Sequence, residues 1–261
     1  MLNLLITHGA LHTYLKIRAS IFLLMMCAML FTCHVNAAPE NPNLKWYTED
    51  YPPFNYQKAN ELNGIALNIL KKAYAELEWQ LNTQDISIMP WARAYYTLKN
   101  EPNACLFSMT YTTERTKDFN FVGTVMPNTV AIIGRSDSVI DEMQLKTDFN
   151  LRFGVVKNDI GHQTLMEYGI PSFQFVYLKT GFELVQMLEH KRIDLIAYGD
   201  VIARYQFKRA NLSQSQFKVI KPLLNSFLGY ACNKHVPDDV IDTLNSTIHR
   251  IVKAHPEIVQ Y

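Results

Sequence analysis

Short apolar runs and longer amphipathic segments alternate along this chain. The short runs suit buried strands, and the longer segments repeat their apolar residues every three or four positions, as helices do. We expect strands at 44–48, 80–83, 104–108, 129–134, 151–156, 173–177, 193–198, 217–220 and 227–232. We expect helices from Gly64, from Pro90, at about 161–168, after Thr180, from Asp200 and at 237–254. This alternation predicts βα units, largely parallel sheets and an α/β fold.

Proline and glycine mark the connections between these elements. Two prolines stiffen the loop at 49–56, in which the neighbouring carboxylates Glu49 and Asp50 are expected to be solvated. Gly169, followed by Pro171, ends a helix. No internal repeat and no low-complexity stretch interrupts the pattern.

The first 37 residues have the pattern of a secretory signal peptide. Lys16 and Arg18 precede an apolar run at 21–31, and small residues allow cleavage after Ala37. The run is short for a membrane span, so an uncleaved anchor is the less favoured alternative. The residues before Cys33 fit a lipoprotein signal poorly, and the true start of translation is left open. We therefore expect export to the periplasm.

Charge is nearly balanced, with 25 basic and 24 acidic residues and a formal net charge of +1. Cleavage after Ala37 removes two basic residues and no acidic one, which leaves a formal charge of −1. A nucleic-acid partner therefore has no electrostatic support. Cys105 and Cys232 remain after cleavage, and an oxidising compartment permits them to pair. Two buried free thiols are the alternative, and the sequence leaves the choice open.

The run 108–121 carries the clearest binding chemistry. It holds hydroxyl side chains, a threonine-rich turn and Arg115, directly after an apolar strand. A guanidinium donates two parallel hydrogen bonds to a carboxylate, and hydroxyls can support it. A surface turn with an exposed arginine is the alternative.

Motifs for catalysis and metal binding are missing from the sequence. It contains no G-x-S-x-G, no H-E-x-x-H and no phosphate loop. His162, His190, His235 and His255 do not have metal-ligand spacing, and a solvated or core histidine is the better interpretation of each. We expect neither enzymatic activity nor a cofactor or metal.

Three segments in order resemble one protein family. These are Y-P-P-F at 51–54, T-x-x-R at 112–115 followed by a phenylalanine run, and R-I-D-L-I at 192–196. Together they resemble the periplasmic solute-binding proteins of family 3, which serve polar amino-acid ABC transporters. The resemblance covers about 44–261. It implies a two-lobed type II periplasmic binding protein fold, each lobe a mostly parallel sheet flanked by helices, joined by a two-strand hinge. The implied lobes are 38–126 with 227–261, and 127–226, with the first crossing near 126–128.

The resemblance also implies residue roles. Arg115 pairs with a ligand carboxylate, the Thr110 hydroxyl assists it, and the Ser108 carbonyl accepts from a ligand amine. Tyr51 stacks on the ligand. Relatives carry a similar P-W-x-R-A, so Trp91, with Arg93, could reach the cleft mouth; a helix packed on the sheet is the alternative.

The chain departs from the family pattern at three places. Asn68 stands where relatives have aspartate. Asp159 stands where relatives have a hydroxyl residue, and it either faces the ligand or turns away to cap its helix. Gly199 stands where an aspartate grips the ligand amine, and Asp200, one residue further on, either takes this role or begins its helix. These changes put a standard α-amino acid in doubt and keep a ligand with extra positive charge, or a neutral polar solute, open.

The resemblance implies a monomer that binds a small polar solute, an amino acid or a related compound, and delivers it to the membrane permease of an ABC importer. One alternative is a sensing module acting on a separate membrane signalling partner. The other is a dehydratase-like enzyme on the same fold, with Asp159 or Asp200 as its general acid.

Overall fold

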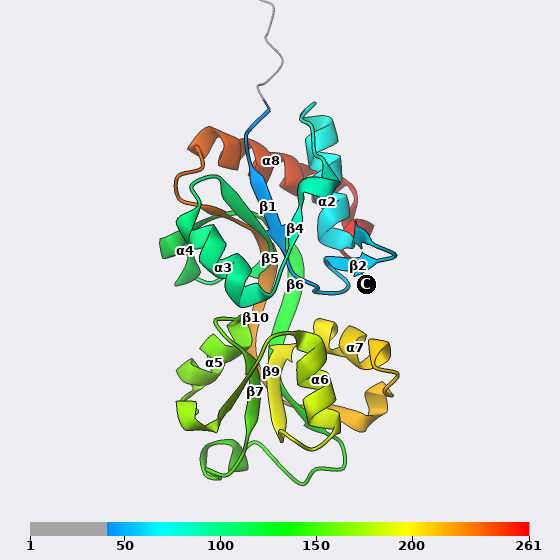
Figure 1. Ribbon diagram of the computed structural model, residues 1–261, viewed down its shortest axis with the longest axis vertical. Coiled ribbons are helices and arrows are strands. Elements are labelled where there is room, and N and C mark those ends of the chain that lie inside the picture. The colour runs from blue at the N-terminus through cyan, green and yellow to red at the C-terminus, as the bar shows by residue number, and fades with distance from the viewer. Residues whose placement is uncertain (1–40, 261) are drawn as a thin grey trace, which may run out of the picture. The chain divides into compact units, whose positions relative to one another are not determined.

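Two strands of 17 residues each run through the centre of the fold, and the computed structural model describes residues 41–260 around them. β6 (Phe119–Arg135) and β10 (Phe217–Asn233) pair antiparallel along their whole length. Figure 1 shows them passing from the group that holds β1, α3 and α8 to the group that holds β7, α5 and α6. They are the strands that join these two groups of elements.

Shorter strands extend the sheet on both sides of this central pair. The order is β4-β1-β5-β10-β6-β9-β7-β8. Within each flank the strands are parallel, and both flanks meet the central pair in antiparallel fashion. The flanking strands are β1 (Lys45–Thr48), β4 (Ser87–Ile88), β5 (Ala104–Thr110), β7 (Phe153–Val156), β8 (Phe175–Leu178) and β9 (Leu195–Gly199). The parallel flanks confirm the predicted α/β class.

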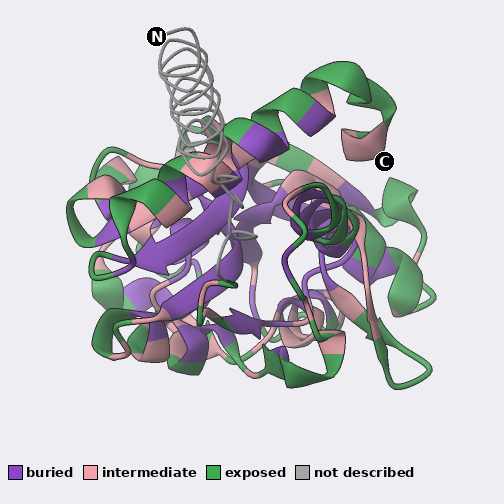
Figure 2. Cartoon of the chain, turned by 90° about the horizontal axis from the view of Figure 1, so that it is seen from above, coloured by how far each residue is buried: buried purple, intermediate pink, exposed green. Residues whose placement is uncertain are grey.

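Helices connect the strands and leave their outer faces exposed, while the strands lie in the interior (Figure 2). They are α2 (Ile65–Glu76), α3 (Trp91–Asn100), α4 (Arg115–Asp118), α5 (Ile160–Tyr168), α6 (Gly181–Glu189), α7 (Asp200–Arg209) and α8 (Asp238–Ala254). Short 3-10 turns lie at Thr83–Asp85, Gln144–Lys146, Ser172–Gln174, Gln214–Gln216 and Pro256–Val259. Among the described residues, no helix is long and apolar enough to cross a membrane.

Several helix ends follow the predicted signals. Gly64 precedes α2 with φ 126°, and a Cβ there would lie 2.2 Å from the Phe54 carbonyl oxygen, so only glycine fits. Gly169 ends α5 in the left-handed conformation. The Thr180 hydroxyl accepts from the backbone N–H of Glu183 and caps α6.

Some predicted strands were wrong in their limits. The predicted strand at 80–83 is absent, because the Asn82 side chain accepts from the Gln84 N–H and closes a 3-10 turn instead. The strand expected at 173–177 begins only at Phe175. Segments 217–220 and 227–232 belong to one strand, which accommodates Pro222 beside a register shift. The strand expected at 129–134 is likewise part of β6, so the chain crosses at 126–128 without leaving the sheet.

A small hairpin was not predicted at all. β2 (Tyr56–Lys58) and β3 (Glu61–Asn63) pair antiparallel across Ala59 and Asn60, which both have positive φ. Positive φ at both central residues is the requirement of a tight two-residue hairpin turn. The polar composition of these strands gives no apolar alternation from which to predict them.

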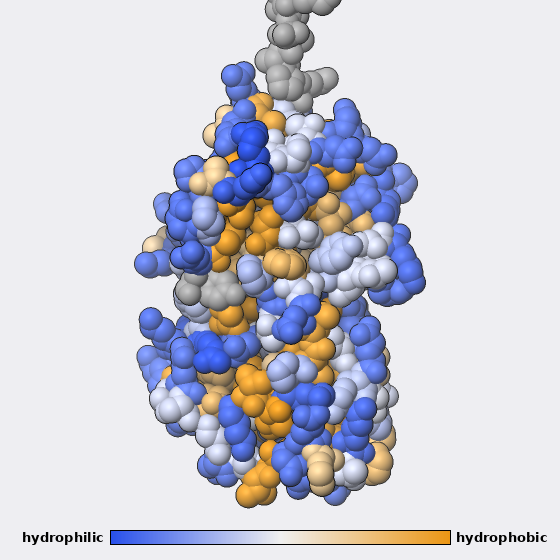
Figure 3. All heavy atoms as spheres, turned by 180° about the vertical axis from the view of Figure 1, so that it is seen from behind, coloured by the Kyte–Doolittle hydropathy of each residue, from blue (hydrophilic) through white to orange (hydrophobic). Residues whose placement is uncertain are grey.

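Apolar packing forms a larger and a smaller cluster. In the larger one the rings of Trp46, Phe107 and Tyr230 meet edge to face at 5.3–5.6 Å. The smaller one lies around β7 and β9 and includes Phe153, Leu165 and Leu195. On the rear face in Figure 3 polar residues predominate and apolar residues show between them, as on most folded domains.

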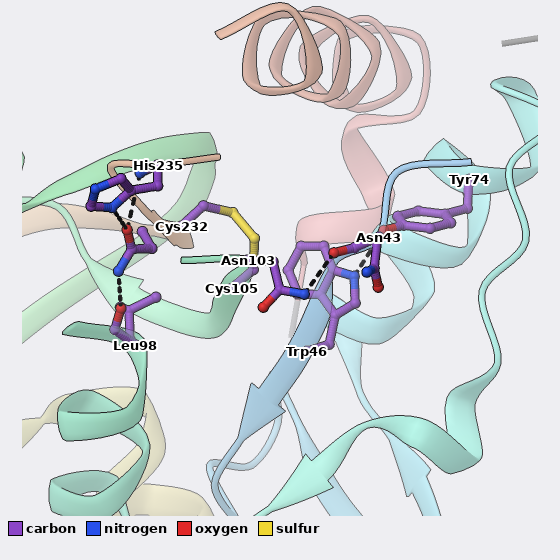
Figure 4. Close-up of a disulfide and its surroundings, with 9 residues drawn as sticks. Asn43, Trp46, Tyr74, Leu98, Asn103, Cys105, Cys232 and His235 are labelled. Atoms are coloured by element: carbon purple, nitrogen blue, oxygen red, sulfur yellow. Dashed lines mark hydrogen bonds between the residues drawn. A yellow bond between two sulfur atoms is a disulfide. The ribbon is translucent and has the colours of Figure 1, made fainter. Parts of the chain in front are cut away.

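A disulfide joins two neighbouring strands. Cys105 in β5 and Cys232 in β10 are register partners, and their sulfur atoms are bonded at 1.97 Å (Figure 4). Both residues are fully buried. The sequence had left this pairing open. The predicted signal peptide, including Ala37 and Cys33, lies outside the described residues.

Candidate functional site

Arg115 is the centre of a buried polar cluster. It begins the short helix α4, and its side chain turns inward, so the residue is only 3% exposed. Its Nη1 donates to the Thr110 carbonyl at 3.1 Å, and its Nη2 lies 3.5 Å from the Asn158 carbonyl oxygen. Burial lowers the pKa of Arg115, and the charge of Asp159 opposes that shift. The guanidinium therefore links the end of β5 to the loop before α5.

Trp91 packs against this guanidinium. The Arg115 Cζ lies 5.6 Å from the centre of the indole ring, within the range of a cation–π contact. Trp91 is buried at the start of α3, whereas Arg93 is exposed. The structure thus brings Trp91 into the cluster and leaves Arg93 outside it.

Thr110 and Ser108 reach the cluster from β5. The Thr110 hydroxyl accepts from the Asn128 side-chain amide at 3.2 Å. The Ser108 hydroxyl donates to the Asn55 side chain. Ser108 has φ 53°, beside a register shift in the pairing of β5 with β10. A bulge of this kind re-aims the following residues, and such distortions cluster at functional sites.

Asp159 enters from the other flank of the sheet. It precedes α5 and is buried, and its Oδ2 has no hydrogen-bond partner. Burial raises the pKa of Asp159, while Arg115 and the backbone amides of Ile160 and Gly161 lower it. The side chain makes no capping hydrogen bond, and no ion pair within 4.0 Å joins it to Arg115 in the described part of the chain. Its charge is therefore only partly compensated.

The loop before Asp159 is fixed by His162. Asn158 has φ 63°, and its N–H donates to His162 Nδ1 at 3.3 Å. This bond requires Nδ1 to be unprotonated, which leaves the proton on Nε2, 3.4 Å from the Tyr177 hydroxyl. Burial lowers the pKa of His162, in keeping with a neutral ring. Of the two interpretations that the sequence left open for His162, solvated or core, the structure shows the core one.

Two tyrosines close the cluster. Tyr51 lies in the Pro52-Pro53 turn, and Tyr198 lies in β9, with ring centres 5.6 Å apart in edge contact. Both are buried, and the Tyr198 hydroxyl has no hydrogen-bond partner. Burial raises the pKa of both phenols well above the usual value, and nearby carboxylates add to the shift.

Gly199 and Asp200 have separate environments. A Cβ on Gly199 would lie 2.9 Å from Asn128 Oδ1 and 3.3 Å from the Tyr51 hydroxyl, so the backbone packs directly on the cluster. Asp200 is the first residue of α7 and pairs with Arg204 at 3.1 Å, four residues along the same helix. The structure does not bring Asp200 to the other candidate residues.

Glu49 corrects an expectation drawn from the sequence. We expected Glu49 and Asp50 to be solvated, but Glu49 is 9% exposed and Asp50 pairs with Arg209. Burial raises the pKa of the Glu49 carboxyl well above its usual value, with further contributions from Asp159 and Asp50. Burial of an acid in a charged loop has no local sequence signal, so Glu49 was missed. Asn55 and Asn128 were missed for the same reason.

Unpartnered polar atoms concentrate in this cluster. Trp91 Nε1, Arg115 Nε, Asn128 Oδ1, Asp159 Oδ2 and the Tyr198 hydroxyl are all buried without a hydrogen bond. Burying such an atom without a hydrogen bond lowers the free energy of unfolding, so a concentration of them in a folded protein calls for a functional explanation. No group of three or more metal-ligating side chains occurs among residues 41–260. The cluster offers donors and acceptors for a charged organic solute.

The fold and this cluster define a class, the type II periplasmic binding proteins. Two solved structures share the fold with TM-scores of 0.70. One is a histidine kinase sensor domain with similarity to periplasmic binding proteins, 15% identical, matched over 83% of this chain and 92% of that chain. The other is the arginine-, lysine-, histidine-binding protein ArtJ from Geobacillus stearothermophilus, 14% identical, matched over 82% and 93%.

The model of the bacterial extracellular solute-binding proteins, family 3, matches residues 45–255, and the chain belongs to that family. This confirms the family that the sequence motifs indicated. A curated relative is the arginine-binding extracellular protein ArtP of Bacillus subtilis (strain 168), 24% identical over 161 residues. That match spans 61% of this chain and 61% of the relative, so it covers about three fifths of each.

Proposed function

We propose that this protein binds a small polar solute, an amino acid or a related compound, in the periplasm. Its lobes are 38–126 with 227–261, and 127–226, and they close on the solute about β6 and β10, as periplasmic binding proteins do. The protein then delivers the solute, as a monomer, to the membrane permease of an ABC importer. It performs no chemistry on the solute.

One observation carries this proposal, the position of Arg115. Its guanidinium is buried and contacts carbonyl groups of Thr110 and Asn158, which belong to different proposed lobes. Arg115 retains an Nε without a partner. A guanidinium held in this way is suited to a ligand carboxylate, with Thr110 beside it and Tyr51 across from it. Membership of family 3 supports the same assignment.

The test is a thermal-shift screen of the chain from Ala38 with amino acids, polyamines, small carboxylates and sugars. A ligand at a hundred times its dissociation constant adds about 2.7 kcal/mol of stability. We expect a hit that carries a carboxylate, and we expect Arg115→Ala to weaken its binding by on the order of 10²–10³-fold, because truncating one partner of a buried charge pair costs about 2–5 kcal/mol.

The matched control is Arg93→Ala, which removes the same side chain from an exposed position on α3. It should bind as the unaltered protein does. Undiminished affinity in the Arg115 variant, with its fold intact by circular dichroism, rejects the carboxylate assignment.

A second candidate function is ligand sensing for a separate membrane signalling partner. The similarity in fold to a histidine kinase sensor domain favours it. Import and sensing are separated by deleting the gene and measuring uptake of the identified solute in cells. Lost uptake supports import, and unchanged uptake with an altered transcriptional response supports sensing.

A further inference from the structure

The candidate site holds more acidic than basic side chains. Glu49 and Asp159 are buried acids, and Arg115 is the buried cation beside them. Among the described residues, neither acid forms an ion pair within 4.0 Å, whereas the neighbouring Asp50 pairs with Arg209. A buried charge without a partner is costly, so two such acids in one cluster call for an explanation.

The backbone of Glu49 is held firmly in place. Its carbonyl accepts from the Asn55 side-chain amide at 2.9 Å and from the Thr48 hydroxyl at 3.2 Å. Asn55 in turn accepts from Ser108, so the loop is tied to the bulged end of β5. The turn that follows is closed by the Tyr51–Asn55 bridge. These contacts fix the backbone at Glu49, which is buried, while Asp50 is 30% exposed and pairs with Arg209.

The charged groups of the site influence one another's pKa values to different extents. The charge of Asp159 shifts the pKa values of four groups, Arg115, Tyr51, Tyr198 and Glu49. The charge of Glu49 raises the pKa values of Tyr51 and Tyr198, but Glu49 is not among the groups that shift the pKa of Arg115. The contacts agree with this: Arg115 Nη2 lies 3.5 Å from the carbonyl oxygen of Asn158, the residue before Asp159, whereas Glu49 lies in the loop of Tyr51, whose ring meets that of Tyr198 at 5.6 Å.

Gly199 lacks the carboxylate that the family resemblance implies at this position. The family resemblance implies an aspartate at that position for the ligand amine, and here the Tyr51 hydroxyl and the Asn128 side chain lie close to the glycine. Asp159 has an unpartnered Oδ2 and follows Asn158, whose carbonyl oxygen lies 3.5 Å from Arg115 Nη2. An ammonium group next to a carboxylate can therefore meet Asp159 while the carboxylate meets Arg115.

We propose that this site takes a basic amino acid of net charge +1, with its carboxylate at Arg115, its α-ammonium at Asp159 and its side-chain cation at Glu49. With both acids ionised, the three side chains sum to −1, which complements this ligand. The rings of Tyr51 and Tyr198, in edge contact at 5.6 Å, offer aromatic surface that suits the aliphatic part and the cation of such a ligand. This inference rests on the proposed function and adds the ligand class and the residue that selects it.

The test compares L-arginine with L-citrulline, which has nearly the same shape and no side-chain charge. Calorimetry on the chain from Ala38 should give at least ten-fold tighter binding of L-arginine. In Glu49→Gln this ratio should fall to about three-fold or less, because the removed carboxylate distinguishes the two ligands. The control is Glu61→Gln, which removes the same charge from an exposed position in β3 and should keep the ratio.

Proton release provides a second measurement. Burial, Asp159 and Asp50 raise the pKa of Glu49, and a ligand cation beside it would lower that pKa, so binding of L-arginine should release protons. The phenols of Tyr51 and Tyr198 face the same carboxyl and stay protonated. Calorimetry in two buffers of different ionisation enthalpy measures this release, which should shrink in Glu49→Gln.

The outcomes separate this inference from the proposed function. Arg115-dependent binding of only neutral or anionic solutes overturns the basic ligand and leaves the proposed function standing. Equal ratios in Glu49→Gln and in the unaltered protein overturn the role of Glu49. If no compound of the thermal-shift panel raises the melting temperature, both the ligand class and the solute-binding function are rejected.

Discussion

At Gly199, the absence of a side chain shapes the candidate site. A Cβ there would lie 2.4 Å from Ile202 Cδ1 as well as close to Asn128 and Tyr51. The residue has φ −62°, which any amino acid adopts, so crowding and not backbone strain disfavours a larger residue. A side chain at this position therefore requires Ile202 and its neighbours to shift.

We predict that Gly199→Asp lowers stability by at least about 1–3 kcal/mol, the usual cost of overpacking. Gly199→Ala adds only the Cβ and should cost less. Chemical denaturation of both variants checks this order. A fully stable Gly199→Asp that binds an amino acid more tightly would show that the neighbours move aside and that the family contact is restored.

Glu49 links the site to the pH dependence of stability. Burial raises its pKa in the folded state, so above the usual pKa of 4.5 the unfolded chain loses a proton that the folded chain keeps. Stability is therefore lost as pH rises from about 4.5 through the raised pKa.

Because glutamine cannot ionise, Glu49→Gln should stabilise the ligand-free protein at neutral pH. The gain should disappear as pH falls toward 4.5, the unperturbed value. Melting temperatures from pH 4 to 8 measure it, with Glu61→Gln as a control whose difference stays flat. A gain independent of pH would mean that packing and not ionisation is responsible.

At the scale of elements, β5 and β10 are joined twice. They pair through backbone hydrogen bonds and through the Cys105–Cys232 disulfide, which spans 127 residues of sequence. The sequence predicted both strand segments and both cysteines. It could not place them as register partners, because strand order depends on contacts far apart in the chain.

We predict that Cys105→Ala with Cys232→Ala lowers the free energy of unfolding by about 2–5 kcal/mol, since the cross-link restricts a long loop in the unfolded chain. Denaturation of the oxidised protein and of the double variant measures the difference. Dithiothreitol should lower the stability of the unaltered protein and leave the variant unchanged. Equal stabilities would show that the bond contributes little.

The two long strands were harder to predict than the short ones. The sequence predicted a crossing at 126–128 and separate strands at 217–220 and 227–232, yet β6 and β10 continue through Pro127 and Pro222. Register shifts accommodate the irregular residues of β10. Most helices were easier, because a periodic apolar face predicts them, helped by local end signals such as Thr180 before α6 and Gly169 after α5.

At the scale of the molecule, an ion pair connects the proposed lobes at their surface. Asp50 follows β1, and Arg209 ends α7; their side chains are paired and are 30% and 50% exposed. Exposed pairs contribute roughly 0.2–1 kcal/mol and are screened by salt. The pair therefore supports closure only weakly.

We predict that Arg209→Ala reduces solute affinity by less than about five-fold and that the effect fades in 1 M salt. Asp50→Arg combined with Arg209→Asp should recover the loss. Isothermal titration at low and high salt is the measurement. A loss as large as that of Arg115→Ala would assign Arg209 a direct part in binding.

The sequence by itself determined the α/β class, the family, most helices and the motif that carries Arg115, because short-range periodicity and local motifs encode them. Tertiary structure decided which polar side chains meet. Glu49, Asn55, Asn128 and Tyr198 come from segments far apart in the chain, and their burial depends on how β1, β5, β6 and β9 converge. It also separated Asp200, paired on its own helix, from Asp159, buried beside Arg115. Burial and charge partners are properties of the assembled fold, and no local pattern records them.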